Sequence, residues 1–75
     1  MKDFVKRKSV ALKVRGQSVN VVYGEQRDGR RGQLSVNSQV LEIGPTPKIK
    51  RRYNALITTQ FQQLGQSVPD ASLIA

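Results

Sequence analysis

The sequence contains neither cysteine nor histidine. Without cysteine there is no disulfide framework or zinc knuckle, and without histidine there is no imidazole for a catalytic triad or a metal. No apolar run approaches the ~20 residues of a membrane span. Residues Met1–Lys8 carry the charge of a signal-peptide start, but no apolar stretch follows them. We therefore expect no membrane association and a cytoplasmic location, or packaging in a particle.

Acidic residues are few and scattered along the chain: Asp3, Glu25, Asp28, Glu42 and Asp70. No two of them are spaced to share a substrate, and no cluster of them offers oxygen ligands to a metal ion. Glycine-rich phosphate loops of the Walker or dinucleotide type are also missing. The sequence therefore predicts a protein that is not an enzyme and that uses no cofactor and no metal.

Basic residues dominate what remains. The 75 residues include 13 Lys and Arg against 5 Asp and Glu, for a formal net charge of +8 at pH 7. Such a chain is long enough for one small domain, and its charge attracts polyanions. All the basic residues lie at or before Arg52, whereas from Tyr53 onward the only charged side chain is Asp70. We therefore assign a basic function to the first two thirds and packing or docking to the last third.

Apolar residues alternate with polar ones through the first half of the chain, which predicts strands. Val10, Leu12 and Val14 share one face, Gly16-Gln17 suits a type II′ hairpin turn, and Ser18–Tyr23 resumes the alternation. Glu25–Gly32 is polar with Asp-Gly at its centre, which predicts an exposed tip. One or two further strands are expected over residues 33–43.

A helix is predicted from about Pro47 to Leu64. Thr46 is expected as its N-cap with Pro47 at the first helical position, and Gly65 as the glycine that ends it. One apolar face runs through the helix at positions Ile49, Tyr53, Leu56, Ile57, Phe61 and Leu64.

These elements predict one small basic domain of the α+β class. Three or four antiparallel strands form a β-meander, packed on one face by the C-terminal α-helix, while the other face stays open. Within residues 1–75 we expect a flexible basic arm or edge strand at 1–8, the meander at 9–43, the helix at 46–65 and a tail at 66–75. A sheet this small also leaves edges through which a homodimer could form.

Three basic clusters are candidates for nucleic-acid binding. Cations in the first turn of a helix are disfavoured by the helix dipole, so a cluster of them at the helix start suggests that a phosphate binds there and offsets the repulsion. The alternative is a basic face that is simply solvated. The open sheet face could lie in a DNA groove or could be an ordinary solvent face, and arginines on the tip could clamp phosphates. The residues proposed are Lys13, Arg15, Arg27, Arg30, Arg31, Lys48, Lys50, Arg51 and Arg52.

The leading hypothesis is therefore a small protein that binds nucleic acid. Double-stranded DNA is favoured over RNA, because three of the four aromatic residues fall on expected core faces and are not free to stack on bases. About six to eight phosphate contacts would give a slope of log K against log salt of roughly −5 to −7. The alternative is a structural or assembly protein, a particle component or adaptor, whose neutral C-terminal segment docks on a partner through Phe61, Leu73 and Ile74.

Overall fold

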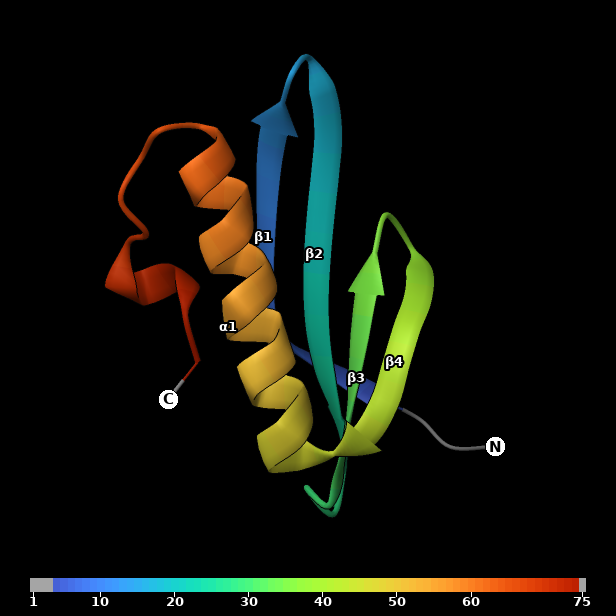
Figure 1. Ribbon diagram of the computed structural model, residues 1–75. Helices are drawn as coiled ribbons and strands as arrows, with labels where there is room; N and C mark the ends of the chain where they lie inside the picture. Colours follow the sequence, from blue (N-terminus) through green and yellow to red (C-terminus); the bar gives the residue numbers. More distant parts are fainter. Residues whose placement is uncertain (1–3, 75) are drawn as a thin grey trace.

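Four antiparallel strands form one sheet in the order β1-β2-β3-β4, and a single helix follows them. The computed structural model describes residues 4–74 and shows the helix lying across one face of the sheet (Figure 1). The elements are β1 Phe4–Val14, β2 Gln17–Gln26, β3 Arg31–Val36, β4 Gln39–Pro45, α1 Thr46–Gln63 and the short 3₁₀ helix η1 Asp70–Ser72. The predicted α+β class, with a meander of four strands and a C-terminal helix, is confirmed.

The register of the sheet places the alternating apolar residues on the face that the helix covers. Val10 pairs with Val21, Leu12 with Val19, and Tyr23 with Leu34. Side chains at these paired positions point to the same face, so they gather against α1. The buried core consists of Val21, Tyr23, Leu34, Ile49, Tyr53, Ile57 and Phe61.

The turn between β1 and β2 lies one residue earlier than the sequence predicts. Val14 pairs with Gln17, so Arg15 and Gly16 are the two loop residues, and both have positive φ, at 53° and 79°. Two central residues of positive φ define a type I′ turn, whose twist matches that of the flanking strands. The predicted type II′ turn at Gly16-Gln17 was therefore wrong, because the strand register places the glycine second.

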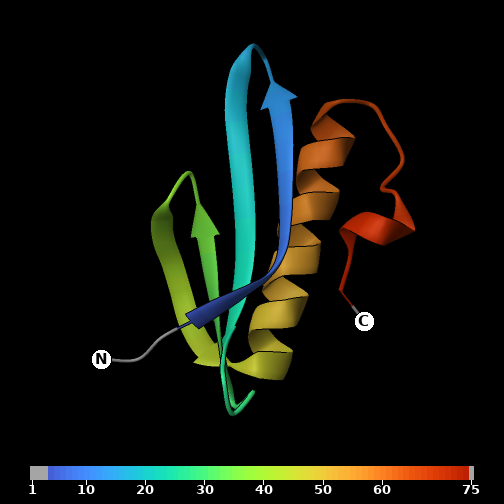
Figure 2. The same cartoon turned by 180° about the vertical axis from the view of Figure 1, so that it is seen from behind.

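The first strand is longer than the alternation predicts. β1 begins at Phe4, so residues 4–8 belong to an edge strand, and the register shifts between Lys6 and Lys8. A bulge of this kind bends a strand. The first part of β1 consequently crosses the sheet face opposite the helix (Figure 2). There Phe4 and Lys6 line a hollow with Val22 and Gln33, so this face is partly covered.

The helix begins directly after β4, without an intervening loop. Thr46 is its first residue, and Pro45 occupies the N-cap position with no side-chain hydrogen bond. The Thr46 hydroxyl instead donates to the carbonyl oxygen of Gly29, at 2.6 Å. The prediction of Thr46 as N-cap was wrong, because the chain enters the helix straight from a strand and turns that side chain toward the β2–β3 turn.

The predicted end of the helix is confirmed at Gly65. This residue has a φ of 69°, its N–H donates to the Gln62 carbonyl, and the Gln66 N–H donates to the Phe61 carbonyl. Those two hydrogen bonds form a Schellman motif, which satisfies carbonyls at the helix end.

The tail then folds back along the helix. The Asn54 side chain donates to the Ile74 carbonyl at 2.7 Å and accepts from the Ile74 N–H at 2.9 Å. Leu73 and Ile74 pack against the core at the same place. In the described residues 4–74, no helix is both long and apolar enough to cross a membrane.

Candidate nucleic-acid interface

The fold divides the predicted basic residues between its two ends. Lys13 and Arg15 lie at the β1–β2 turn, whereas the β2–β3 turn and the start of α1 lie at the opposite end (Figure 1). The ten residues of β2 separate the two ends by about 30 Å at the usual rise per residue. We call the second group the basic end, which comprises Arg27, Arg30, Arg31, Lys48, Lys50, Arg51 and Arg52.

Hydrogen bonds fix the β2–β3 turn against the start of the helix. The Thr46 N–H donates to the Arg30 carbonyl at 3.2 Å, beside the bond from the Thr46 hydroxyl to Gly29. Within the turn, Asp28 accepts a hydrogen bond from the Arg30 N–H at 2.9 Å. Asp28 thus stabilises the conformation of the turn. The turn and the helix start are joined by hydrogen bonds, so the basic side chains of these two distant segments of the sequence lie next to each other.

Glu42 neutralises part of the basic end. Its carboxylate lies 3.5 Å from the Lys48 Nζ and 3.4 Å from the Arg52 Nε. Glu42 reaches them because it pairs with Leu34 across β3 and β4, which turns its side chain toward the helix. Two of the four cations at the helix start therefore face this carboxylate, which stabilises them there without any ligand.

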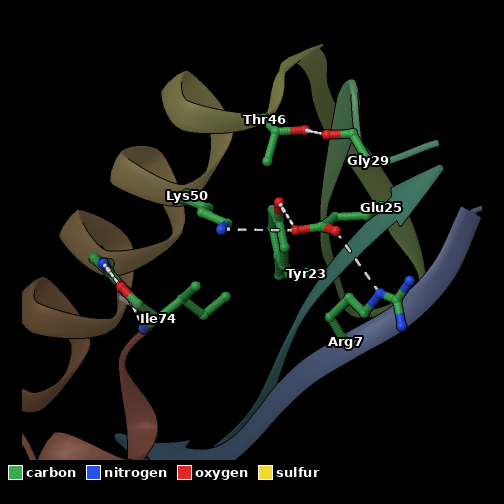
Figure 3. A network of polar contacts seen from close by, with 8 residues as sticks. Arg7, Tyr23, Glu25, Gly29, Thr46, Lys50 and Ile74 are labelled. Carbon is green, nitrogen blue, oxygen red and sulfur yellow. Dashed lines mark hydrogen bonds and ion pairs between the residues drawn. The ribbon is translucent and has the colours of Figure 1, made fainter. Parts of the chain in front are cut away.

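Glu25 is the centre of a second polar network, drawn in Figure 3. It accepts a hydrogen bond of 2.9 Å from the Tyr23 hydroxyl, and it lies 3.9 Å from the Lys50 Nζ and 3.8 Å from the Arg7 Nε. Burial, and then the hydrogen bond to Glu25, raise the pKa of the Tyr23 hydroxyl above its usual value. Glu25 therefore joins the buried core to the charged surface.

Four arginines of the basic end differ from its other cations. Arg27, Arg30, Arg31 and Arg51 are exposed, and none of them forms an ion pair with an acidic residue in the described range 4–74. An unpaired guanidinium keeps its full set of donors for an incoming anion and binds phosphate in bidentate fashion. The sequence predicted these arginines as binding residues. Only the fold shows which of the predicted cations form ion pairs with Glu25 and Glu42 and which do not.

The predicted partner-binding residues take part in packing within the chain, Phe61 as a buried residue and Leu73 and Ile74 as partly buried ones. Phe61 is 7% exposed within the core, and Leu73 and Ile74 pack against that core. Large exposed apolar side chains lie on β4 instead, at Val40, Leu41 and Ile43. Sequence reasoning did not assign these residues a binding role, because an apolar run in a strand is typical of burial and their exposure follows from the place of β4 at the sheet edge.

The described part of the chain offers no cluster of metal-binding side chains. Groups of three or more acidic, histidine or cysteine side chains that could hold a metal ion are absent from residues 4–74. The arrangement instead offers a fixed set of cations at one end and an apolar edge along β4. Comparison of the chain with protein-family models, curated proteins and solved structures found no match.

Proposed function

We propose that the protein binds double-stranded DNA non-enzymatically by gripping phosphates with its basic end. The observation that supports this most is the set of four exposed arginines, Arg27, Arg30, Arg31 and Arg51, without acidic partners in residues 4–74. Hydrogen bonds between the β2–β3 turn and the helix start fix the backbone positions of these arginines relative to one another, so only their side chains have to be ordered on binding. Phosphate then accepts their donors in pairs.

The choice of a duplex rests on the aromatic residues. Tyr23 and Tyr53 are fully buried and Phe61 is 7% exposed, so none of these three rings is available for stacking on unpaired bases. Recognition of single strands depends on such stacking. Phosphate contacts to a regular duplex require only well-placed cations, which the basic end supplies.

The number of contacts predicts the salt dependence. Four arginine–phosphate contacts give a slope of log K against log salt of about −4. The steeper slope of roughly −5 to −7 would require further cations such as Lys13 and Arg15, about 30 Å away, to reach the same duplex. A titration of a labelled duplex by fluorescence anisotropy at several salt concentrations measures this slope directly.

Two neighbouring arginines provide a matched test. Arg51 has no acidic partner within the described range, whereas Arg52 lies 3.4 Å from Glu42. We expect Arg51→Ala to weaken DNA binding and to make the slope less steep by about 0.9, and Arg52→Ala to have the smaller effect. Glu42→Gln should do the opposite, strengthening binding and steepening the slope, because it frees two cations.

Equal effects of the two arginine variants would contradict the role given to the basic end. Micromolar or weaker binding with no salt dependence in the unmodified protein would contradict nucleic-acid binding altogether. If single-stranded RNA of the same length bound more tightly than the DNA duplex, the argument from buried aromatic rings would fail.

The alternative of an assembly protein that docks through its C-terminal segment has less support. Leu73 and Ile74 pack against the core, and the Asn54 side chain holds the backbone of Ile74 with two hydrogen bonds. A partner would first have to displace these contacts.

A further inference from the structure

The two edges of the sheet differ in chemical character. β1 carries Lys6, Arg7, Lys8 and Lys13 along its length. β4 carries no cation, and its side chains Val40, Leu41 and Ile43 are 50%, 57% and 47% exposed. Lysines on an edge strand prevent it from pairing with another strand, so β1 is protected and β4 is not.

The remaining features of β4 protect only part of it. Its register against β3 shifts at Leu41, and Pro45 removes one backbone donor at its last position. Its single charged residue, Glu42, is matched by Lys48 and Arg52 of the helix. Among residues 4–74, the edge therefore combines apolar side chains and little net charge with backbone groups that no other strand pairs.

We propose that a second copy of this chain pairs with β4, antiparallel and about a two-fold axis, to form a continuous sheet across the dimer. Each β4 would supply the same apolar residues to the other, as a two-fold interface requires. A two-fold axis perpendicular to the sheet would leave both helices on the same face. This inference rests on the exposed edge alone and does not depend on DNA binding.

The distribution of charge favours this arrangement over other pairings of two copies, each of which carries +8. The basic end lies beside the last residue of β4, because Arg31 pairs with Pro45. Antiparallel pairing of two seven-residue strands therefore sends the two basic ends in opposite directions, with about 20 Å of strand between them. That separation exceeds the Debye length of about 10 Å at 0.1 M salt, whereas β1–β1 pairing would bring lysines into contact.

The surface next to β4 also has room for side chains of a second copy. A hollow of about 320 Å³ lies between β4 and α1, lined by Leu34, Leu41, Glu42, Arg52, Ala55, Leu56 and Thr59. Apolar side chains form much of its wall, directly inside the unpaired edge. Because each β4 has only seven residues, we expect the interface to bury less than the roughly 800 Å² per partner of a standard stable complex, and the dimer to be reversible.

Sedimentation velocity over a range of about 10 to 1,000 µM protein tests the dimer. The sample is freed of nucleic acid with nuclease and checked by absorbance, since bound DNA could bridge two copies. We expect the mass to rise from 8.4 kDa to twice that value and to stop there. A monomer over the whole range would overturn the proposal, and growth beyond a dimer would indicate head-to-tail pairing of β4 with β1 instead.

A matched pair of variants identifies the edge. Val40→Lys/Ile43→Lys should shift the dissociation constant at least tenfold toward monomer, while Val5→Lys should leave it unchanged. Val5 is a suitable control because it is an exposed apolar residue, 37% accessible, on the other edge strand. Circular dichroism verifies that both variants stay folded. An unchanged dimer in the β4 variant, or equal weakening by both variants, would overturn the proposal.

Cross-linking gives a readout independent of stability. Because the chain has no cysteine, Leu41→Cys introduces a single thiol near the middle of β4, close to the proposed two-fold axis. We expect it to form a disulfide-linked dimer rapidly on oxidation, and Ser9→Cys on β1 to form one slowly. Cross-linking at equal rates would overturn the proposed arrangement.

Discussion

Replacing Gly32 by alanine tests how tightly the sheet packs against the helix. Gly32 is buried in β3, between Glu25 of β2 and Gly44 of β4. A Cβ added there would lie 3.0 Å from the Tyr23 Cε1 and 3.1 Å from the Ile49 Cβ. These distances are shorter than ordinary van der Waals contact. The glycine is therefore needed because a ring and a helix side chain occupy the space where a side chain would go.

Neither neighbour has room to move away. Tyr23 is fully buried, its hydroxyl bonds to Glu25, and its ring lies against that of Tyr53 with centroids 6.0 Å apart. The Ile49 Cβ is attached directly to the helix backbone, so moving it means moving the helix. Overpacking of this kind costs about 1–3 kcal/mol. A core of this size rarely contributes more than about 3–5 kcal/mol, so the loss should be a large part of the total.

Urea denaturation followed by far-UV circular dichroism measures the free energy of unfolding of the Gly32→Ala variant. A loss of about 2 kcal/mol should also lower the melting temperature by about 8–16 °C in a domain of this length.

Gly44→Ala is the matched control, because Gly44 pairs directly with Gly32 across the sheet. A Cβ at Gly44 would lie 3.6 Å from the Ile49 Cδ1, which is ordinary contact. Alanine also restricts the unfolded chain, so we expect this variant to match the wild type or to be up to about 1 kcal/mol more stable. If Gly32→Ala were no less stable than Gly44→Ala, the packing argument would be refuted.

Three further predictions concern the tyrosines and the tail. In residues 4–74 the buried Tyr53 hydroxyl has no hydrogen-bond partner, so Tyr53→Phe should raise the free energy of unfolding by about 1 kcal/mol in urea denaturation. Tyr23→Phe loses the hydrogen bond to Glu25 and should lower the free energy of unfolding by a similar amount. Burial raises the pKa of both hydroxyls in the folded state, so the unfolded chain releases their protons first as the pH rises. The contribution of the two tyrosines to the free energy of unfolding should therefore be constant below about pH 9 and fall above about pH 10, by up to ~1.4 kcal/mol per pH unit for each tyrosine. The fall should be less steep in Tyr53→Phe. Asn54→Ala removes both side-chain bonds to Ile74, so hydrogen exchange at the Ile74 amide should accelerate at least tenfold without a comparable change in the helix core; an unchanged rate would contradict a tail held by Asn54.

Local patterns were sufficient to predict the elements of the fold. The alternation of Val10, Leu12 and Val14 predicted a strand, because successive side chains of a strand point to opposite faces. The apolar positions 49, 53, 57 and 61 predicted the buried face of the helix, because they are one turn apart. Gly65 predicted the helix end, because glycine adopts positive φ without strain.

Errors arose where one residue of register decided the outcome. The β1–β2 turn differs from the prediction by one position, since Gly16 suits either place in a two-residue loop and strand pairing chooses between them. For residues 1–8 the sequence predicts either a flexible arm or an edge strand, because this polar stretch alternates too weakly to decide between them; residues 4–8 belong to the edge strand β1. Thr46 took another role because its hydrogen-bond partner, Gly29, is 17 residues away.

By itself the sequence determined that this is a small basic chain with a meander, a helix and a neutral tail, since composition and periodicity are properties of neighbouring residues. The tertiary structure decided which cations remain available. Glu42 reaches Lys48 and Arg52, and Glu25 reaches Lys50, only because strand register and helix packing bring them together. Among residues 4–74, the same packing leaves four arginines without acidic partners and the β4 edge without a neighbouring strand. Ion pairs depend on distance in space, and spacing along the chain does not give that distance.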